Sequence, residues 1–319
     1  MTQWLYRRLR AEDPSIDPSH SRRGTLNYFK ALSLLCSTGF SDEELAAFYS
    51  SKVTRRKVNP KADTLAFENM LMALHELSAL QAMSRRGQNS YDLIRSAIVS
   101  WYYGIYCAGS AMIAAKDGGN QQDHTGTANA WDNHIAKANY VPTPFALRVT
   151  TLIKSDYEAE ISTLRPGVEY SLHDAAQDRD QALEVYLSHL KGTATWWREN
   201  REAMIKKKNK IPNFRKKEHR ELRDQQLQKQ SLGFMHQAFR YRGKAHYRDA
   251  IYLAYGDNQA EQQIQDLSDD LYTTLSCYIR MASHYCSRRV EKSTWSQFLN
   301  DLSKNSLLSH DLDVLKGSG

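Results

Sequence analysis

The sequence has no run of the roughly 18 uncharged apolar residues that a membrane-spanning helix needs. Its most apolar stretch, residues 97–115, is interrupted by aromatic residues and two glycines. The N-terminal residues lack the apolar segment of a signal peptide, and the mean hydropathy of the chain is −0.64. We therefore expect a cytoplasmic protein in which residues 97–115 form a buried helix.

Cysteine is also scarce. The four cysteines, Cys36, Cys107, Cys277 and Cys286, include no C-x-x-C pair and no Cys/His cluster with zinc-ligand spacing. They are predicted to be free, buried thiols in a reducing compartment. No clear carboxylate–histidine cluster has metal-ligand spacing, and no glycine-rich phosphate loop follows a strand. The sequence therefore predicts no metal site and no cofactor.

Segments with period-two alternation of apolar and polar residues are few, whereas apolar residues recur at helical spacing along most of the chain. We therefore predict an all-α fold. Residues 1–23, which are polar and basic, are predicted to form an irregular arm. The predicted helices cover residues 26–40, 45–50, 64–83, 92–115, 128–138, 174–190, 195–208, 219–237, 259–287 and 293–302.

Local signals mark the ends of several predicted helices. Ser41 and Glu44 have the spacing of a capping box, and Asp63 is predicted to be the N-cap of the next helix. The helix over residues 174–190 is predicted to end before Gly192. Pro212 is predicted to break a long basic helix, because proline lacks the backbone donor that a helix interior needs.

Positive charge is concentrated in one part of the chain. The net charge is +7, and residues 197–249 contain 16 Lys and Arg against 6 Asp and Glu. A clustered basic surface points to a polyanion such as nucleic acid, although a solvated helix face gives the same pattern. The residues predicted to contact nucleic acid here are Lys206, Lys207, Lys208, Lys210, Arg215, Lys216, Lys217, Lys244 and Arg248.

Within this region, Arg242 and His246 are four residues apart and would project from one face of a helix. Arg can hold a phosphate in its guanidinium fork, and His can move a proton near neutral pH. The pair is a candidate site for cutting a phosphodiester. Spacing alone does not select it, because three Arg-x-x-x-His pairs occur: Arg215/His219, Arg242/His246 and Arg280/His284.

Two segments together resemble HEPN domains. In residues 95–115, paired tyrosines and small residues lead through a glycine turn to His124, as in the second helix and following loop of that family. Residues 242–249 resemble its C-terminal helix, where ribonuclease members have an Arg, four to six intervening residues and a His. Arg242 and His246 have three intervening residues, and Arg240 and His246 have five.

The resemblance implies a metal-independent ribonuclease, usually dimeric. His246 would be the general acid or base in the attack of the RNA 2′-hydroxyl on the adjacent phosphate. Arg242 or Arg240 would stabilise the charge on the phosphate oxygens, and Lys244 and Arg248 would hold the flanking backbone. A toxin or antiviral-defence role would fit the family. The alternative is a non-catalytic all-α subunit that binds nucleic acid, RNA in preference to DNA, or a partner protein in a defence complex.

The expected organisation is a HEPN-like helical bundle with additional N- and C-terminal helices. Residues 1–60 are predicted to form an N-terminal segment of basic residues followed by helices. Residues 61–316 are predicted to form the HEPN-like domain, with a basic insertion around residues 195–232. Residues 317–319 look like a cloning remnant.

Several other residues have a structural interpretation. Tyr102, Tyr103 and Tyr106 are predicted to be core residues, and His189 a packing histidine. His124 is predicted to lie in a polar loop, facing solvent or bracing the loop. Trp196 and Trp197 are predicted to anchor a core or an interface, with base stacking as the alternative.

Overall fold

The computed structural model describes residues 4, 7–8, 11, 18–84, 93–170, 174–246, 253, 260–308 and 312–316 of the chain. These residues contain helices and no strand; one isolated antiparallel bridge joins Val149 and Leu232. The all-α prediction is confirmed. The helices are α2 (Pro18–Cys36), α3 (Asp42–Ser50), α4 (Pro60–Ser84), α5 (Ile94–Asp117), α6 (His124–Trp131), the π-helix η2 (Asp132–Ala136), α7 (Lys154–Leu164), α8 (Arg179–Asn209), α9 (Lys217–Gln228), α10 (Phe234–His246), α12 (Ala260–Arg289), α13 (Lys292–Asn305) and α14 (Asp313–Lys316).

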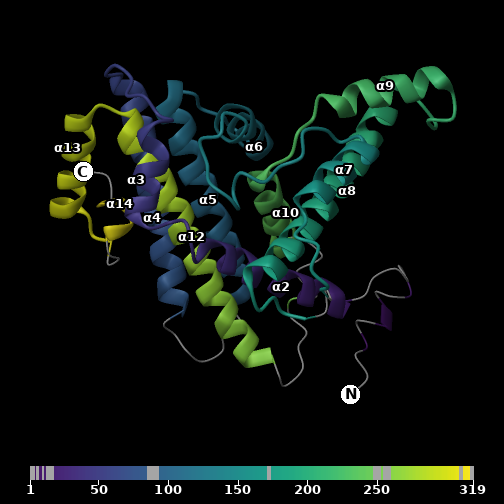
Figure 1. The fold of residues 1–319 in the computed structure, drawn as a ribbon, viewed down its shortest axis with the longest axis horizontal. Helices are drawn as coiled ribbons and strands as arrows, with labels where there is room; N and C mark the ends of the chain where they lie inside the picture. The colour runs from purple at the N-terminus through teal and green to yellow at the C-terminus, as the bar shows by residue number, and fades with distance from the viewer. Residues whose placement is uncertain are drawn as a thin grey trace.

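Helix α5 lies at the centre of the molecule, between α4 and α12 on one side and α6 and α10 on the other (Figure 1). It is buried along most of its length, as predicted for residues 97–115. Among the described helices it alone is long and apolar enough to cross a membrane by length and composition, and 67% of its most apolar window is buried. Gly104 and Gly109 face Leu275 and Met235 so closely that an added Cβ would overlap them.

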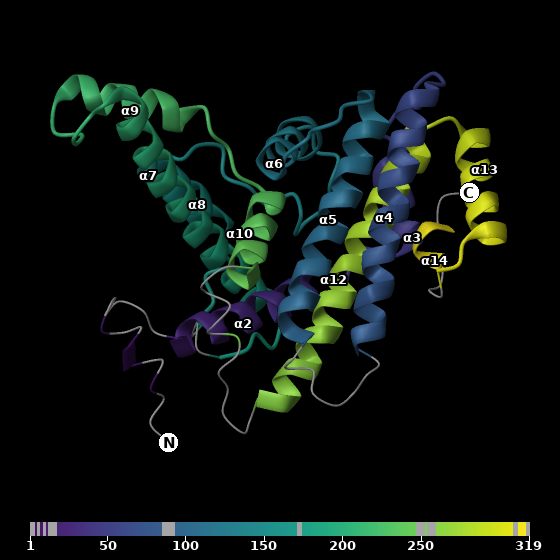
Figure 2. The ribbon, with the colours of Figure 1, turned by 180° about the vertical axis from the view of Figure 1, so that it is seen from behind.

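Helices α7, α8, α9 and α10 form a second group beside this bundle (Figure 2). A smaller apolar cluster, which includes Tyr157, Leu187 and Leu227, holds α7, α8 and the end of α9 together. The distal end of α8 and helix α9 extend away from the rest of the molecule (Figure 1). We call residues 197–228, which form this extension, the basic arm.

Helix α2 joins the two groups, and its aromatic residues are central to the packing. The Tyr28 ring stacks on Tyr241 with centroids 4.1 Å apart, and Phe29 meets Trp101 edge to face at 4.9 Å. One hydrophobic cluster therefore runs from α2 to α14, and packing is continuous across residue 60. The predicted irregular arm over residues 1–23 is wrong for residues 18–23, which are helical. Pro18 is the first residue of α2, where its missing N–H costs nothing.

The helix-end predictions had mixed outcomes. The capping box is confirmed: Ser41 Oγ accepts from Glu44 N, and Glu44 Oε2 accepts from Ser41 N. Asp63 as an N-cap is wrong, because α4 already begins at Pro60 and Asn59 Oδ1 accepts from Ala62 N. Asp63 is instead buried and forms an ion pair with Arg56.

The two helix breaks predicted around the basic arm also had different outcomes. Helix α8 continues through Gly192, so the predicted end before this residue is wrong. An added Cβ at Gly192 would lie 3.3 Å from Arg240 Nη1, so glycine here allows α10 to pack closely. The break near Pro212 is confirmed, since α8 ends at Asn209 and Lys210 adopts a left-handed conformation with φ of 54°.

Candidate functional site

Helix α10 turns Arg242 toward α5, where its charge lies against aromatic rings. The Arg242 Cζ is 5.8 Å from the ring centroids of both Tyr102 and Tyr103, and 5.9 Å from that of Phe239. These distances are within the range of cation–π attraction. Of the three tyrosines predicted to be core residues, Tyr102 is buried, whereas Tyr103 and Tyr106 are half-buried beside Arg242 and His124.

His124 belongs to the same cluster, which the sequence did not predict. It is the first residue of α6 and not a loop residue, because Asp123 Oδ1 accepts from Gly126 N at 2.7 Å and caps the helix. The His124 Nδ1 lies 2.9 Å from Tyr102 Oη, and its ring centroid is 5.9 Å from that of Phe239. We call Tyr102, Tyr103, Tyr106, His124, Phe239 and Arg242 the Arg242 cluster.

The cluster changes the proton affinity of its members. Burial lowers the pKa of His124, the Arg242 charge lowers it further, and Asp123 opposes both effects. His124 is therefore mainly neutral at pH 7. Burial also raises the pKa of Tyr102, so its hydroxyl keeps its proton. When Tyr102 Oη accepts from His124 Nδ1–H, the Nε2 lone pair of His124 is available to take a proton.

The guanidinium of Arg242 has an unused donor. Its Nε is buried without a hydrogen-bond partner, and no ion pair involves Arg242 among the residues that the structure describes. A half-buried cation without a carboxylate gains from any anion that can reach it. A phosphate fits this need, because its oxygens match the guanidinium fork.

The predicted catalytic residues on α10 differ in exposure and in the direction of their side chains. Arg242 and His246 are one turn apart, as their spacing predicts; Arg242 is half-buried, and His246 is exposed at the last residue of the helix. Arg240 points elsewhere, because its Nη1 donates to Thr193 Oγ1 on α8 at 3.2 Å. Residues two apart on a helix face in different directions, so Arg240 and Arg242 do not face the same neighbours.

Lys244 also lies on the α8 side of α10, with Nζ 5.2 Å from the ring of Tyr241. Tyr241 Oη is 2.6 Å from His189 Nδ1. Burial, together with the charges of Lys244 and Arg240, lowers the pKa of His189 to about 3. His189 is therefore a neutral packing residue, as predicted. Arg248, which the sequence predicts to contact nucleic acid, lies outside the described residues.

The basic arm presents most of its predicted phosphate contacts to solvent. Lys207 and Lys208 are exposed in the last turn of α8, and Lys210 follows them. Lys206 is half-buried, with Nζ 5.1 Å from the centre of the Phe214 ring. The turn into α9 adds three exposed cations: Arg215, Lys216 and Lys217.

The pair Arg280/His284 has a structural role. His284 is buried on α12, and its Nε2 lies 3.0 Å from Asp42 Oδ1 at the start of α3. Burial lowers the pKa of His284, and the hydrogen bond to Asp42 opposes this. In the third pair, His219 Nδ1 lies 3.0 Å from the carbonyl oxygen of Asn213 and braces the turn before α9.

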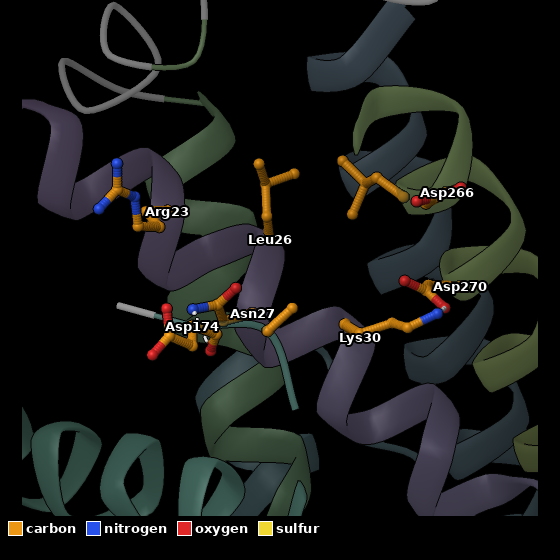
Figure 3. Close-up of a pocket in the computed structure, with 9 residues that line it drawn as sticks. Arg23, Leu26, Asn27, Lys30, Asp174, Asp266 and Asp270 are labelled. Atoms are coloured by element: carbon orange, nitrogen blue, oxygen red, sulfur yellow. Dashed lines mark hydrogen bonds and ion pairs between the residues drawn. The ribbon is translucent and has the colours of Figure 1, made fainter. Parts of the chain in front are cut away.

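A separate pocket of about 350 Å³ lies between α2, residues 174–175 and α12 (Figure 3). Lys30 and Asp270 approach each other across it, with Lys30 Nζ 3.9 Å from Asp270 Oδ1. Burial raises the pKa of Asp270. None of the predicted site residues lines this pocket, and its opposite charges partly compensate one another.

All four cysteines are free, as predicted; Cys36 and Cys286 are buried, and Cys107 and Cys277 half-buried. The described part of the chain contains no group of three His, Cys, Asp or Glu side chains that could hold a metal ion. Comparison with protein-family models, with curated proteins and with solved structures found no match to this chain. The resemblance to HEPN domains therefore stays a prediction from the sequence.

Proposed function

We propose that this chain binds RNA and cleaves it without a metal ion at the Arg242 cluster. The observation that carries the proposal is that one residue, Tyr102, links Arg242 to His124: its ring centroid is 5.8 Å from the Arg242 Cζ, and its Oη is 2.9 Å from His124 Nδ1. Burial and then the Arg242 charge lower the pKa of His124. Arg242 supplies a site for a phosphate, and His124 is a neutral imidazole beside it. His246, one turn from Arg242 along α10, provides the second histidine.

The proposed reaction is a transesterification within the RNA strand, in which the phosphate moves from O5′ to the neighbouring 2′-oxygen. His124 Nε2 removes the proton from an RNA 2′-hydroxyl, whose oxygen attacks the adjacent phosphorus while the bond from phosphorus to O5′ breaks. His246 in its protonated form gives a proton to the leaving O5′. Arg242 stabilises the negative charge that builds up on the non-bridging oxygens. The products carry a 2′,3′-cyclic phosphate and a 5′-hydroxyl.

The basic arm supplies the affinity in this proposal. Lys207 and Lys208 are exposed at the end of α8, and Lys210 directly follows it; Lys216 and Lys217 are exposed at the start of α9. Exposed cations that neutralise phosphates release counterions, so binding should weaken steeply with salt. Pairing of two copies, and a toxin or antiviral-defence role, follow from the same family resemblance and belong to the same proposal.

A cleavage assay tests the assignment of roles. Wild type and the variants Arg242→Gln, His124→Ala and His246→Ala are incubated with mixed RNA in EDTA, and the 3′ ends of the products are identified. We expect cyclic-phosphate ends from wild type and a loss of rate of about 100-fold or more in each variant, with RNA binding retained in the histidine variants. Arg240→Gln is the matched control, and should cleave at nearly the wild-type rate because Arg240 faces α8.

One observation favours a second function, a non-catalytic subunit that binds RNA or a partner protein. Three rings surround the Arg242 guanidinium, whereas His246 is exposed at the end of α10. In that case no condition gives cleavage, while Arg242→Gln still loses affinity for RNA. Cleavage that persists in all three site variants would contradict both functions as assigned to the Arg242 cluster. Equal affinity for DNA of the same sequence would remove the preference for RNA.

A further inference from the structure

Aromatic rings that are partly or largely accessible form a continuous row from the basic arm to Arg242. Trp196 and Trp197 on α8 meet edge to face with centroids 5.4 Å apart, and Trp197 lies 6.1 Å from Phe239 on α10. The row continues from Phe239 through His124 to Tyr106, whose centroid is 4.9 Å from that of His124. Four helices contribute to it: α8, α10, α6 and α5.

These rings are more exposed than packing requires. Trp196 is 37% exposed, although a residue of this size is normally well buried. Trp197, Phe239, Tyr103 and Tyr106 each keep part of their surface accessible. A contiguous apolar patch with polar edges is typical of a binding surface.

Positive charge lies at both ends of the row. Arg242 is at one end, against Phe239 and the tyrosines. Toward the other end, Lys207 is exposed on the same face of α8 as Trp196, about three turns further along and therefore about 15 Å away. Cations beside stacking platforms are the arrangement with which proteins bind single-stranded nucleic acid.

We propose that this row is a track for single-stranded RNA, on which unpaired bases stack at Trp196 and lead the strand to Arg242. The inference rests on the proposed function and names its substrate class. Duplex RNA does not fit, because its bases are already stacked on one another and expose no faces to the rings. The basic arm then holds the backbone of the strand, and the rings select for unpaired bases.

The test compares two RNA probes: a fluorescently labelled, unstructured single strand, and the same strand annealed to its complement. Trp196→Ala should weaken binding of the single strand about tenfold and leave binding of the duplex nearly unchanged. Trp196→Phe should restore most of the loss, since a flat ring remains. Met204→Ala is the matched control, because Met204 is 60% exposed on the same helix but cannot stack.

Thermal unfolding of each variant establishes that it is folded. If Trp196→Ala binds the single strand as tightly as wild type does, the proposed track is contradicted, while the proposed RNA binding stays intact. Equal losses for single strand and duplex would also overturn the track, because they would indicate a general effect on the arm. If wild type binds neither probe, the proposed function itself fails, and that outcome is visible before any variant is made.

Discussion

At the scale of single residues, Arg242 acts on its surroundings through both its charge and its position. The guanidinium lies against Tyr102, Tyr103 and Phe239, where water is partly excluded. Burial lowers the pKa of His124, and the positive charge of Arg242 lowers it further because it disfavours a second positive charge nearby. The same charge attracts a phosphate. In the proposed function, one residue would therefore both bind the phosphate and contribute to the lowered proton affinity of the candidate base.

Replacing Arg242 should therefore change the titration of His124. In Arg242→Gln we expect the pKa of His124 to rise toward its ordinary value of 6.5, because one of the two causes of its lowering is removed. Burial remains, so the rise should be incomplete. The imidazole C2–H signal followed by NMR against pH measures this, with His124→Ala identifying the signal. In Arg240→Gln the signal should titrate as in wild type, and an unchanged pKa in Arg242→Gln would contradict the coupling.

The sequence predicted part of this cluster and missed part of it. Spacing placed Arg242 and His246 on one helix, because a helix repeats every 3.6 residues. It did not place His124 in the same cluster as Arg242, since the two residues lie on helices far apart in the sequence and share only neighbouring rings, such as those of Tyr102 and Phe239. The sequence Asp123-His124-Thr125-Gly126 contained one usable signal: an Asp that can cap a helix puts the following residue in its first turn.

At the scale of elements, the small residues of α5 set how closely α12 can approach. A Cβ added at Gly104 would lie 2.6 Å from both terminal carbons of Leu275, closer than packed atoms allow. The sequence predicted that residues 97–115 form a buried helix, and its glycines allow another helix to approach closely. It did not identify the partner, because the apolar faces of several helices fit such a surface equally well.

Gly104→Ala should consequently destabilise the protein. We expect the free energy of unfolding to fall by about 1–3 kcal/mol, because Leu275 must leave its rotamer or the helices must separate. Urea unfolding followed by circular dichroism measures the change. Gly243→Ala is the matched control: Gly243 is also helical, but its added Cβ has nothing within 4 Å. It should stabilise α10 by about 0.5–1 kcal/mol, and a similar loss in both variants would contradict the packing argument.

Some helix boundaries can be predicted from neighbouring residues in the sequence, and others cannot. The Ser41–Glu44 capping box and the break near Pro212 were predicted correctly, because each depends on hydrogen bonds within a few residues. The end before Gly192 was wrong, because glycine destabilises a helix only slightly and packing of α8 against α2 and α10 outweighs it. Asp63 failed as a cap because Asn59 precedes it and takes that role.

At the scale of the whole molecule, buried histidines join the two groups of helices. His189 on α8 contacts Tyr241 on α10, and both lie against Tyr28 of α2. His236 on α10 accepts from Gly233 N at Nδ1, and its Nε2 lies 3.0 Å from Asn129 Oδ1 on α6. The hydrogen bond from Gly233 needs a neutral His236 ring, because Nδ1 must accept. Burial disfavours the charged form of both rings. The bundle and the α7–α10 group should therefore lose stability together when the rings take up protons.

Acid should destabilise the fold in a pH window that these groups define. Burial lowers the pKa of His236 to about 4 and that of His189 to about 3, whereas both have pKa values near 6.5 in the unfolded chain. Above pH 6.5 both states are neutral, and the shifts have no effect. As the pH falls below 6.5, the histidines bind protons in the unfolded chain but not in the folded protein, so the free energy of unfolding decreases. The decrease stops only below the folded pKa values, near pH 4 to 3.

Urea unfolding at pH 7, 6 and 5 tests this window. The lowered pKa values of Glu44, Glu158 and Glu291 act mainly below 4.5. The raised pKa values of Glu76 and Asp270 increase stability as the pH falls, so a net loss between pH 6.5 and 5 belongs to the histidines. His124 and His284 add to it in the same direction. His236→Gln should be less stable than wild type at pH 7 but should lose less stability on acidification. An equal slope in the two proteins would mean that His236 takes up its proton without unfolding, and that the loss of the hydrogen bond from Gly233 N to its Nδ1 does not destabilise the fold.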